Sequence, residues 1–123
     1  MKVSFDFDGC LVDNKCVQMI CKLFQSSGHD IFIITSRDPK LPNLDLWKLA
    51  QDFQISSENV HLTNGSLKVH MFMELGIDLH FDNSFDEVVA INDMFEGSDN
   101  LPAILTNFNS EEMGYIYNFV KKL

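Results

Sequence analysis

Near its beginning the chain reads Lys2-Val3-Ser4-Phe5-Asp6-Phe7-Asp8-Gly9, an apolar run that ends in two aspartates and a glycine. Such a run, closed by a turn residue, predicts a β-strand over Lys2–Phe7. Because side chains alternate along a strand, Asp6 and Asp8 would point the same way for as long as the strand lasts. Two neighbouring carboxylates repel each other unless a cation or a shared proton compensates them. A hard cation such as Mg2+ prefers oxygen ligands, so the pair predicts a site for phosphate chemistry.

Short apolar runs and amphipathic segments alternate along the rest of the chain. The further strands expected are Ile31–Thr35, Asn59–Thr63, Leu79–Asp82 and Ala103–Leu105. Between them, apolar residues recur at helical spacing in two groups: Val17, Ile20, Cys21 and Phe24, then Leu46, Leu49, Ala50 and Phe53. This alternation predicts an α/β fold, a Rossmann-like doubly wound parallel sheet of about five strands with helices on both faces. In such sheets the ligand crevice lies beyond the carboxyl ends of the strands.

Capping residues predict where three more helices begin. Ser66 is expected to cap a third helix that stops at Gly76. Ser84, followed three residues later by Glu87, is a capping-box pattern for a fourth. The last helix is expected to be capped by Ser110, and its end charges suit the helix dipole: Glu111 and Glu112 at the start, Lys121 and Lys122 at the end.

The bulk properties narrow the classes of partner. A length of 123 residues fits one domain over residues 1–123. The net charge of -9 argues against binding to extended nucleic acid or to anionic membranes. No apolar stretch approaches the roughly 20 residues needed to span a bilayer. Three cysteines without a secretory signal predict reduced thiols in a cytoplasmic protein.

Polar residues follow three of the expected strands, and one lysine lies near the start of an expected helix. Because the carboxyl ends of parallel strands meet at one edge of a sheet, they should gather there. The first strand ends in Asp6-Phe7-Asp8-Gly9-Cys10, the second in Thr35-Ser36-Arg37 and the fourth in Asp82-Asn83, with Asp86 just beyond and Lys68 near the third helix start.

These residues resemble the four motifs of the haloacid dehalogenase superfamily of phosphohydrolases. The motifs occur in the family's order, matched by Asp6-Phe7-Asp8-Gly9-Cys10, Thr35, Lys68, and Asp82 with Asp86. They span residues 6 to 86, and the sheet pattern continues beyond them, so the resemblance covers nearly the whole chain. Cys10 stands where Thr or Val is usual, and Asn83 stands where some members have a second acid. Neither departure removes a group that the chemistry needs.

The resemblance implies a Mg2+-dependent phosphatase that works through an aspartyl-phosphate intermediate. Asp6 would be the nucleophile, and Asp8 would be the general acid and then the general base. The Asp6 carboxylate, the Asp8 backbone carbonyl and Asp82 would hold Mg2+. Thr35 would donate a hydrogen bond to a phosphoryl oxygen, and Lys68 would neutralise charge on the phosphate and on Asp6.

Four flanking residues are weaker candidates. Ser36 and Arg37 are expected to contact the substrate phosphate, although Arg37 could equally pair with Asp38 at the surface. Asn83 and Asp86 are expected in the outer shell of the metal, although Asp86 could instead be a first-turn acid that favours the helix dipole.

Other residues near the site have structural interpretations. Cys10 is expected to pack in the core rather than act as a nucleophile, because acidic neighbours raise the pKa of a thiol. His80, two residues before the acid that ends the fourth strand, is more simply a buried structural histidine than a lining residue of the pocket. If Lys68 is a solvated helix residue, Lys40 and Lys48 are the alternatives for the catalytic lysine.

The segments that follow the strands are too short for an inserted cap domain, so a capless member of the superfamily is expected. Its open site would admit a phosphorylated macromolecule. Alternatively, a short loop or a second subunit of a homo-oligomer would close it over a small phosphate ester.

Two other functions stay open. One is a catalytically degenerate binding module of the same fold. The other is a phospho-accepting receiver domain of signalling proteins, which needs an acid at the end of the third strand. The stretch Val60-His61-Leu62-Thr63-Asn64 offers none.

Overall fold

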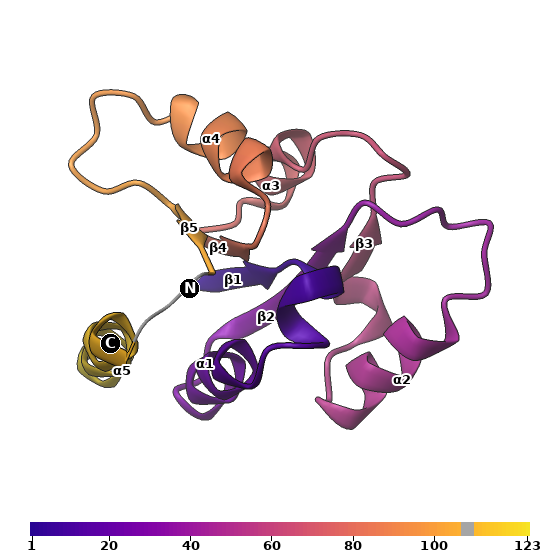
Figure 1. Ribbon diagram of the computed structural model, residues 1–123, viewed down its shortest axis with the longest axis horizontal. Coiled ribbons are helices and arrows are strands. Elements are labelled where there is room, and N and C mark those ends of the chain that lie inside the picture. Colours follow the sequence, from indigo (N-terminus) through magenta and orange to yellow (C-terminus); the bar gives the residue numbers. More distant parts are fainter. Residues whose placement is uncertain (107–109) are drawn as a thin grey trace.

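The structure is a computed structural model that describes residues 1–106 and 110–123. Within these ranges, five parallel strands form one sheet in the order β3-β2-β1-β4-β5 (Figure 1). The strands are β1 (Lys2–Phe5), β2 (Asp30–Thr35), β3 (Val60–Leu62), β4 (Leu79–Asp82) and β5 (Ala103–Leu105). The expected Rossmann-like α/β fold is therefore confirmed. The order reverses at β1, which places the end of this strand at the ligand-binding switch point of such sheets.

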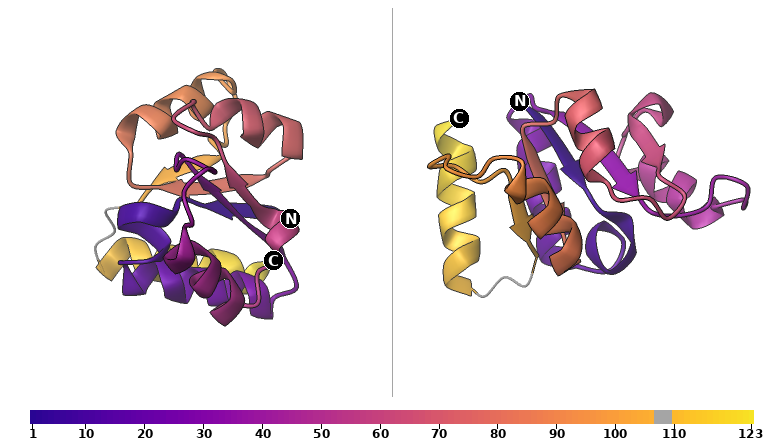
Figure 2. Two further views of the ribbon diagram at one scale, coloured as in Figure 1. Left: turned by 90° about the vertical axis from the view of Figure 1, so that its right-hand side faces the viewer. Right: turned by 90° about the horizontal axis from the view of Figure 1, so that it is seen from above.

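Helices cover both faces of the sheet, as Figure 2 shows. One face carries α1 (Lys15–Ser26), α2 (Leu44–Asp52) and α5 (Ser110–Lys122), and the other carries α3 (Val69–Leu75) and α4 (Phe85–Asp93). Two single helical turns, over Phe7–Leu11 and Ser57–Asn59, complete the regular structure of the described ranges. No helix in these ranges is long and apolar enough to cross a membrane.

The first strand is shorter than expected. It ends at Phe5 instead of continuing to Phe7, because the chain enters a helical turn over Phe7–Leu11. The backbone N–H of Asp6 still bonds to β4 at 2.8 Å, so this residue stays at the sheet edge. Gly9 then adopts a φ of +67°, a conformation that costs glycine little. The turn carries Asp8 away from the direction of the strand.

Two helix starts differ from their sequence patterns. The third helix begins at Val69 with Lys68 in the capping position, so the prediction that Ser66 caps it is wrong. Ser66 lies in the turn after β3, where its carbonyl accepts a hydroxyl hydrogen bond at 2.7 Å. Ser84 does precede α4, but its side chain makes no capping bond. Glu87 binds the backbone N–H of Lys68 at 2.9 Å instead of returning to Ser84.

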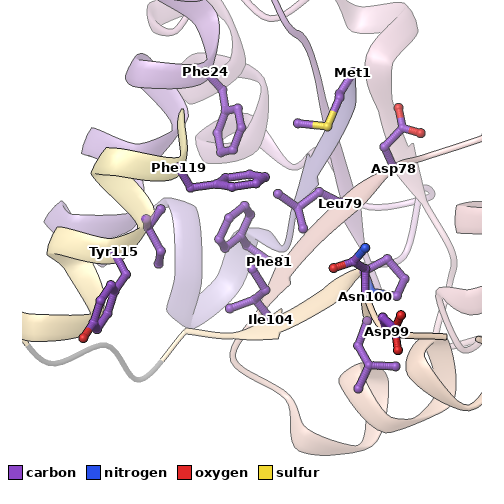
Figure 3. A pocket seen from close by; sticks show the side chains of 13 residues that line it. Met1, Phe24, Asp78, Leu79, Phe81, Asp99, Asn100, Ile104, Tyr115 and Phe119 are labelled. Atoms are coloured by element: carbon purple, nitrogen blue, oxygen red, sulfur yellow. The ribbon is translucent and has the colours of Figure 1, made fainter. Parts of the chain in front are cut away.

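The last helix, α5, packs beside α1 (Figure 1). Its end charges are those expected from the sequence: Glu111, Glu112, Lys121 and Lys122. The Ser110 side chain, and with it the predicted cap, lies outside the described part. Between α5 and the sheet is a cavity of about 560 Å³. Figure 3 shows that its walls include Phe24, Phe81 and Phe119. It lies toward the amino ends of β4 and β5, away from the edge where the candidate site is expected.

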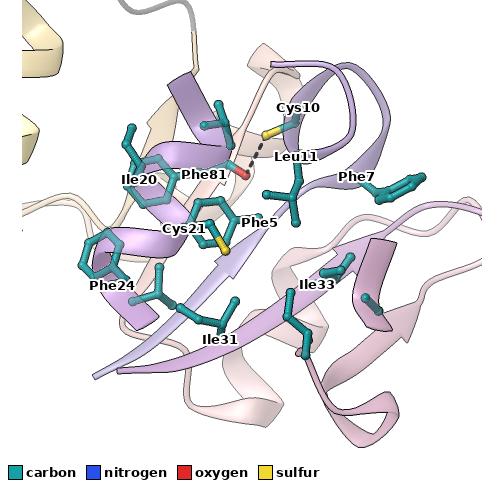
Figure 4. Close-up of a cluster of buried hydrophobic side chains, with 14 of the residues drawn as sticks. Phe5, Phe7, Cys10, Leu11, Ile20, Cys21, Phe24, Ile31, Ile33 and Phe81 are labelled. Atoms are coloured by element: carbon teal, nitrogen blue, oxygen red, sulfur yellow. Dashed lines mark hydrogen bonds between the residues drawn. The ribbon is translucent and has the colours of Figure 1, made fainter. Parts of the chain in front are cut away.

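Alternation along the strands divides the core between the two faces. Val3, Phe5 and Phe81 belong to the cluster under α1 and α2, where the Phe5 and Phe81 rings stack at 5.0 Å (Figure 4). Burying each such side chain contributes about 1.5–3 kcal/mol. Cys10 is in this cluster, with its thiol 3.7 Å from a backbone carbonyl, so its expected packing role is confirmed. The second cluster lies under α3 and α4: Phe32, Ile34, Phe72, Ile77, Val88, Ile91 and Ala103.

Candidate active site

The candidate site is built on one buried lysine between two buried carboxylates. Lys68 Nζ lies 2.6 Å from Asp6 Oδ1 and 2.7 Å from Asp82 Oδ2. The side chains are 3%, 8% and 0% exposed, in the order Lys68, Asp6, Asp82. Asp6 follows β1 and Asp82 ends β4, the neighbouring strand, so the sheet sets the two acids side by side. The structure therefore brings together three of the residues that the sequence selected.

The position of Lys68 depends on the junction between α3 and α4. Its backbone N–H donates to Glu87 Oε2 at 2.9 Å, which ties the start of α3 to the first turn of α4. The sequence pattern predicts only a capping role for Glu87, and this residue is too far from Lys68 along the chain for a local pattern to indicate the contact. Neither alternative lysine belongs to the buried cluster: Lys48 is 78% exposed and pairs with Asp52, and Lys40 is exposed.

The charges in the cluster shift one another's pKa. Burial raises the pKa of Asp6 to about 6, although the Lys68 ammonium opposes the shift. Burial would also raise the pKa of Asp82, but the hydrogen bond from His80 and the charge of Lys68 hold it below its usual range. Burial alone would lower the pKa of Lys68, but the two carboxylates outweigh it and the pKa is raised. The cluster thus holds a permanent cation beside an acid that ionises near neutral pH.

Asp8 does not share this cluster. Its carboxylate is 57% exposed and receives two hydrogen bonds from Arg37, Nε to Oδ2 at 2.9 Å and Nη2 to Oδ1 at 2.7 Å. The expectation that Asp6 and Asp8 point the same way is wrong, because the strand ends before either residue. The two acids have divided between two cations, Lys68 for Asp6 and Arg37 for Asp8.

Arg37 is held in place by more than Asp8. Its guanidinium also donates to both carboxylate oxygens of Asp45, at 2.6 and 2.8 Å, and lies 4.8 Å from the centre of the Phe7 ring. Surface pairing of Arg37 with Asp38 was the alternative from the sequence, and the partners observed are Asp8 and Asp45 instead. Asp45 was missed, and its one sequence signal was an acid in the first turn of a helix.

Thr35 and Ser36 take up different positions after β2. Thr35 is buried, and its Oγ1 accepts the backbone N–H of Arg37 at 3.4 Å. Ser36 is exposed, and its carbonyl accepts the N–H of Gly65 at 2.8 Å, which joins the segments that follow β2 and β3. Neither side chain bonds to Asp6 or Lys68 within the described ranges.

The two outer residues also differ. Asn83 is exposed and lies against the turn after β1, where a Cβ added to Gly9 would overlap the Asn83 side-chain amide. Asp86 is an exposed acid in the first turn of α4, and nothing in residues 1–106 and 110–123 links it to the buried cluster. Its position is that of the first-turn acid considered from the sequence.

Ser4 and His80 extend the cluster into the protein. His80 is fully buried, as expected of a structural histidine, but its Nε2 lies 2.8 Å from Asp82 Oδ2. Its Nδ1 lies 2.6 Å from Ser4 Oγ. The sequence held only one signal of this contact, which was the alternation that puts His80 and Asp82 on one face of β4.

The oxygen atoms of the cluster fit Mg2+. Lys68 binds one oxygen of each acid, which leaves Asp6 Oδ2 and Asp82 Oδ1 as carboxylate ligands of the hard type that Mg2+ prefers. No group of three acidic, histidine or cysteine side chains in the described part could hold a metal by itself. A cation here would therefore need a backbone carbonyl, such as that of Asp8, and water to complete its shell.

The arrangement combines a buried carboxylate, a fixed ammonium and oxygen ligands at the open edge of the sheet. Comparisons of the chain with protein-family models, with curated proteins and with solved structures find no match. The chemistry of this cluster is therefore the basis on which a function can be assigned.

Proposed function

We propose that the protein is a Mg2+-dependent phosphomonoesterase of the haloacid dehalogenase type, with Asp6 as the nucleophile. The observation that carries the proposal is the buried triad of Asp6, Lys68 and Asp82, held by contacts of 2.6 and 2.7 Å. Burying two acids and a lysine together costs free energy of folding unless their charges compensate one another well, so such a cluster suggests a functional role. At a switch point of the sheet, a carboxylate beside a fixed cation is suited to attack an anionic phosphate.

The proposed reaction has two halves. In the first, an Asp6 oxygen bonds to phosphorus, the bond to the leaving oxygen breaks, and that oxygen takes a proton from Asp8. In the second, the ionised Asp8 takes a proton from water, and the water oxygen displaces Asp6 from phosphorus. Inorganic phosphate leaves and Asp6 is regenerated. Lys68 stabilises the added negative charge, and Thr35 donates its hydroxyl to a phosphoryl oxygen.

Mg2+ would be held by Asp6, Asp82 and the Asp8 carbonyl. When bound, it would neutralise the phosphoryl oxygens and align them for in-line displacement. The protein's own part is to fix the two carboxylates by means of Lys68.

The proposal requires Asp8 to part from Arg37. While both Asp8 oxygens accept from the guanidinium, neither is free to exchange a proton with a leaving group bound at Asp6. We expect substrate to separate them, with Asp45 retaining Arg37 through its own two hydrogen bonds. The guanidinium and Ser36 would then face the substrate phosphate.

One observation favours a second candidate function. Because both carboxylate oxygens of Asp8 are bound by Arg37, the protein could bind phosphate without turning it over, as a degenerate binding module of the same fold. The receiver alternative loses support, because receiver sheets have the order 2-1-3-4-5 and this sheet has the order 3-2-1-4-5.

The open edge of the sheet is compatible with two classes of substrate. The short segments after the strands leave room for a phosphorylated macromolecule, and a loop or a second subunit could close the site over a small phosphate ester. The net charge of -9 disfavours a long nucleic acid. Three free cysteines, Cys10, Cys16 and Cys21, fit a reducing compartment such as the cytoplasm.

The test is phosphate release from p-nitrophenyl phosphate, nucleotides, sugar phosphates and phosphopeptides, with and without Mg2+. Turnover is expected to need Mg2+ and to be lost in Asp6→Asn, whereas Asp52→Asn, an exposed acid on α2, should keep it. Binding of beryllium fluoride, an analogue of the phosphoryl group, should likewise depend on Asp6. Binding without turnover would support the second candidate, and neither binding nor turnover would overturn both.

A further inference from the structure

A buried row of hydrogen bonds runs from β1 through β4 to the proposed metal site. Ser4 Oγ lies 2.6 Å from His80 Nδ1, and His80 Nε2 lies 2.8 Å from Asp82 Oδ2. All three side chains are fully buried. Burying polar groups costs free energy unless each finds a partner, and here every polar atom of the imidazole has one.

The sheet itself places these residues. Ser4 pairs directly with His80 in the register of β1 and β4, and the apolar neighbours Val3, Phe5 and Phe81 point to the opposite face. Alternation then puts His80 and Asp82 on the face that Lys68 approaches from α3. The row is therefore a feature of the strand pairing and does not depend on a loop.

The direction of each hydrogen bond follows from donors and acceptors. The Asp82 carboxylate can only accept, so His80 Nε2 must carry the hydrogen. In an imidazole that carries its single hydrogen at Nε2, the other ring nitrogen, Nδ1, is an acceptor. The Ser4 hydroxyl must consequently donate to Nδ1. One serine thus selects the histidine tautomer that presents an N–H to Asp82.

The hydrogen bond from His80 affects which carboxylate oxygen of Asp82 is available to bind a cation. Oδ2 accepts from both Lys68 and His80, and Oδ1 accepts a backbone N–H from Ser84 at 2.9 Å. These three donors, Lys68, His80 and the backbone of Ser84, hold the carboxylate. Because Oδ2 already accepts two hydrogen bonds and Oδ1 accepts one, Oδ1 is the oxygen with more capacity left to bind a cation.

We infer that His80, held in one tautomer by Ser4, is a positioning residue that sets the Asp82 carboxylate for Mg2+. This inference rests on the proposed function, because it assigns His80 a role at the metal site of that reaction. Hydrogen-bond partners of metal ligands typically change metal affinity or activity by about 10–100-fold when they are removed.

Two substitutions of His80 separate its two nitrogens. Gln carries its amide nitrogen near the position of Nε2, so His80→Gln keeps a donor to Asp82. Asn reaches only as far as Nδ1, so His80→Asn loses that donor. Mg2+ affinity measured by calorimetry is expected to fall about tenfold in His80→Asn and to stay within about threefold of wild type in His80→Gln. His70→Asn, at an exposed histidine, is the matched control.

Ser4 offers a second pair of variants, each of which changes the size of the buried side chain by only one heavy atom. Ser4→Ala removes the hydroxyl and should weaken Mg2+ binding, whereas Ser4→Thr keeps the hydroxyl and should restore it. Nitrogen-15 spectra of the wild-type protein should show His80 protonated at Nε2 and not at Nδ1. Thermal unfolding of each variant separates a loss of metal binding from a loss of the fold.

The outcomes distinguish this inference from the proposed function. If wild type binds Mg2+ and every folded variant binds it equally, the positioning role is overturned and the phosphatase proposal stands. A His80 protonated at Nδ1 would also overturn it. If wild type binds no Mg2+ and releases no phosphate, the proposed function fails, and the inference fails with it.

Discussion

Arg37 donates to both carboxylate oxygens of Asp8, at 2.9 and 2.7 Å, and also to both oxygens of Asp45, at 2.6 and 2.8 Å. Each acid therefore holds the guanidinium in a bidentate contact of the strong, charge-assisted kind. The side chain of Arg37 is 23% exposed, so these contacts lie at the surface and can exchange with solvent. Of its two partners, Asp8 is the one that the proposed chemistry requires to move.

Asp45 is expected to promote turnover although it lies outside the buried triad. In Asp45→Asn, Arg37 loses one of its two carboxylate partners and keeps Asp8, so Asp8 should be released less readily. We expect kcat to fall about threefold to fivefold, a modest effect in keeping with a surface ion pair. Asp8→Asn, which removes the acid itself, should lower kcat by about 100-fold or more. Steady-state kinetics of both variants measure this.

The control for Asp45 is Asp52→Asn at the other end of α2, where the acid pairs only loosely with Lys48 at 3.8 Å. Equal kcat values for Asp45→Asn and Asp52→Asn would show that Asp45 plays no part in freeing Asp8. A structure with beryllium fluoride bound should show Asp8 separated from Arg37 and Asp45 still in contact with it.

Lys68 is expected to be the largest single contributor to stability among the lysines. Lys68→Met leaves Asp6 and Asp82 buried without a cation, which should lower the free energy of unfolding by about 3–5 kcal/mol at pH 7. Without Lys68, both carboxyl groups should have a raised pKa in the folded state. Their cost therefore grows as the pH rises and is relieved at pH 5. Urea unfolding at both pH values tests this, with Lys48→Met, 78% exposed, as the control. A Lys68→Met protein as stable as Lys48→Met would contradict the expectation.

Mg2+ binding is expected to weaken in acid because of Asp6. Burial raises the pKa of this carboxyl to about 6, so it takes up a proton as the pH falls through that value. The pKa of Asp82 lies below its usual range, so this acid stays ionised over the same interval. Competition by one proton should make Mg2+ binding about tenfold weaker at pH 5 than at pH 7. Calorimetry would measure it, and affinity that does not change with pH would argue that Asp6 is not a ligand.

Gly9 is expected to tolerate no side chain, for two separate reasons. Its φ of +67° is unfavourable for other residues, and an added Cβ would overlap the Asn83 amide. Gly28 has a φ of +83° with open space around it, so Gly28→Ala should show the backbone cost alone, about 1–2 kcal/mol. Gly9→Ala should be less stable than Gly28→Ala, and Asn83→Ala should recover part of the difference. Equal stabilities in thermal unfolding would mean that Asn83 moves aside freely.

The sequence predicted the parts of the fold that depend on local patterns. The expected bounds of β4 and β5 match the structure, because apolar runs closed by turn residues specify buried strands. The placement of Asp6, Lys68 and Asp82 together could also be predicted, since parallel strands bring their carboxyl ends to one edge.

Other features depend on contacts between distant residues and left little trace in the sequence. The separation of Asp6 from Asp8 arises because the strand ends at Phe5, two residues before its expected end, and a helical turn begins at Phe7. Arg37 pairs with Asp8 and Asp45 and not with its neighbour Asp38, because tertiary geometry determines which carboxylates lie within its reach. For the same reason Glu87 bonds to the start of α3 instead of completing its own capping box.

The place of β1 in the middle of the sheet has a consequence for synthesis on the ribosome. β1 pairs with β2 on one side, through Val3 and Ile31, and with β4 on the other, through Val3 and Leu79. Asp6 therefore emerges early, while Lys68 and Asp82 emerge only after most of the chain has been made. Until then one edge of β1 is unpaired, and the nascent chain holds Asp6 without its compensating cation. A protein stalled before Leu79 would be open to pairing with other strands and would lack the Asp82 part of the cluster.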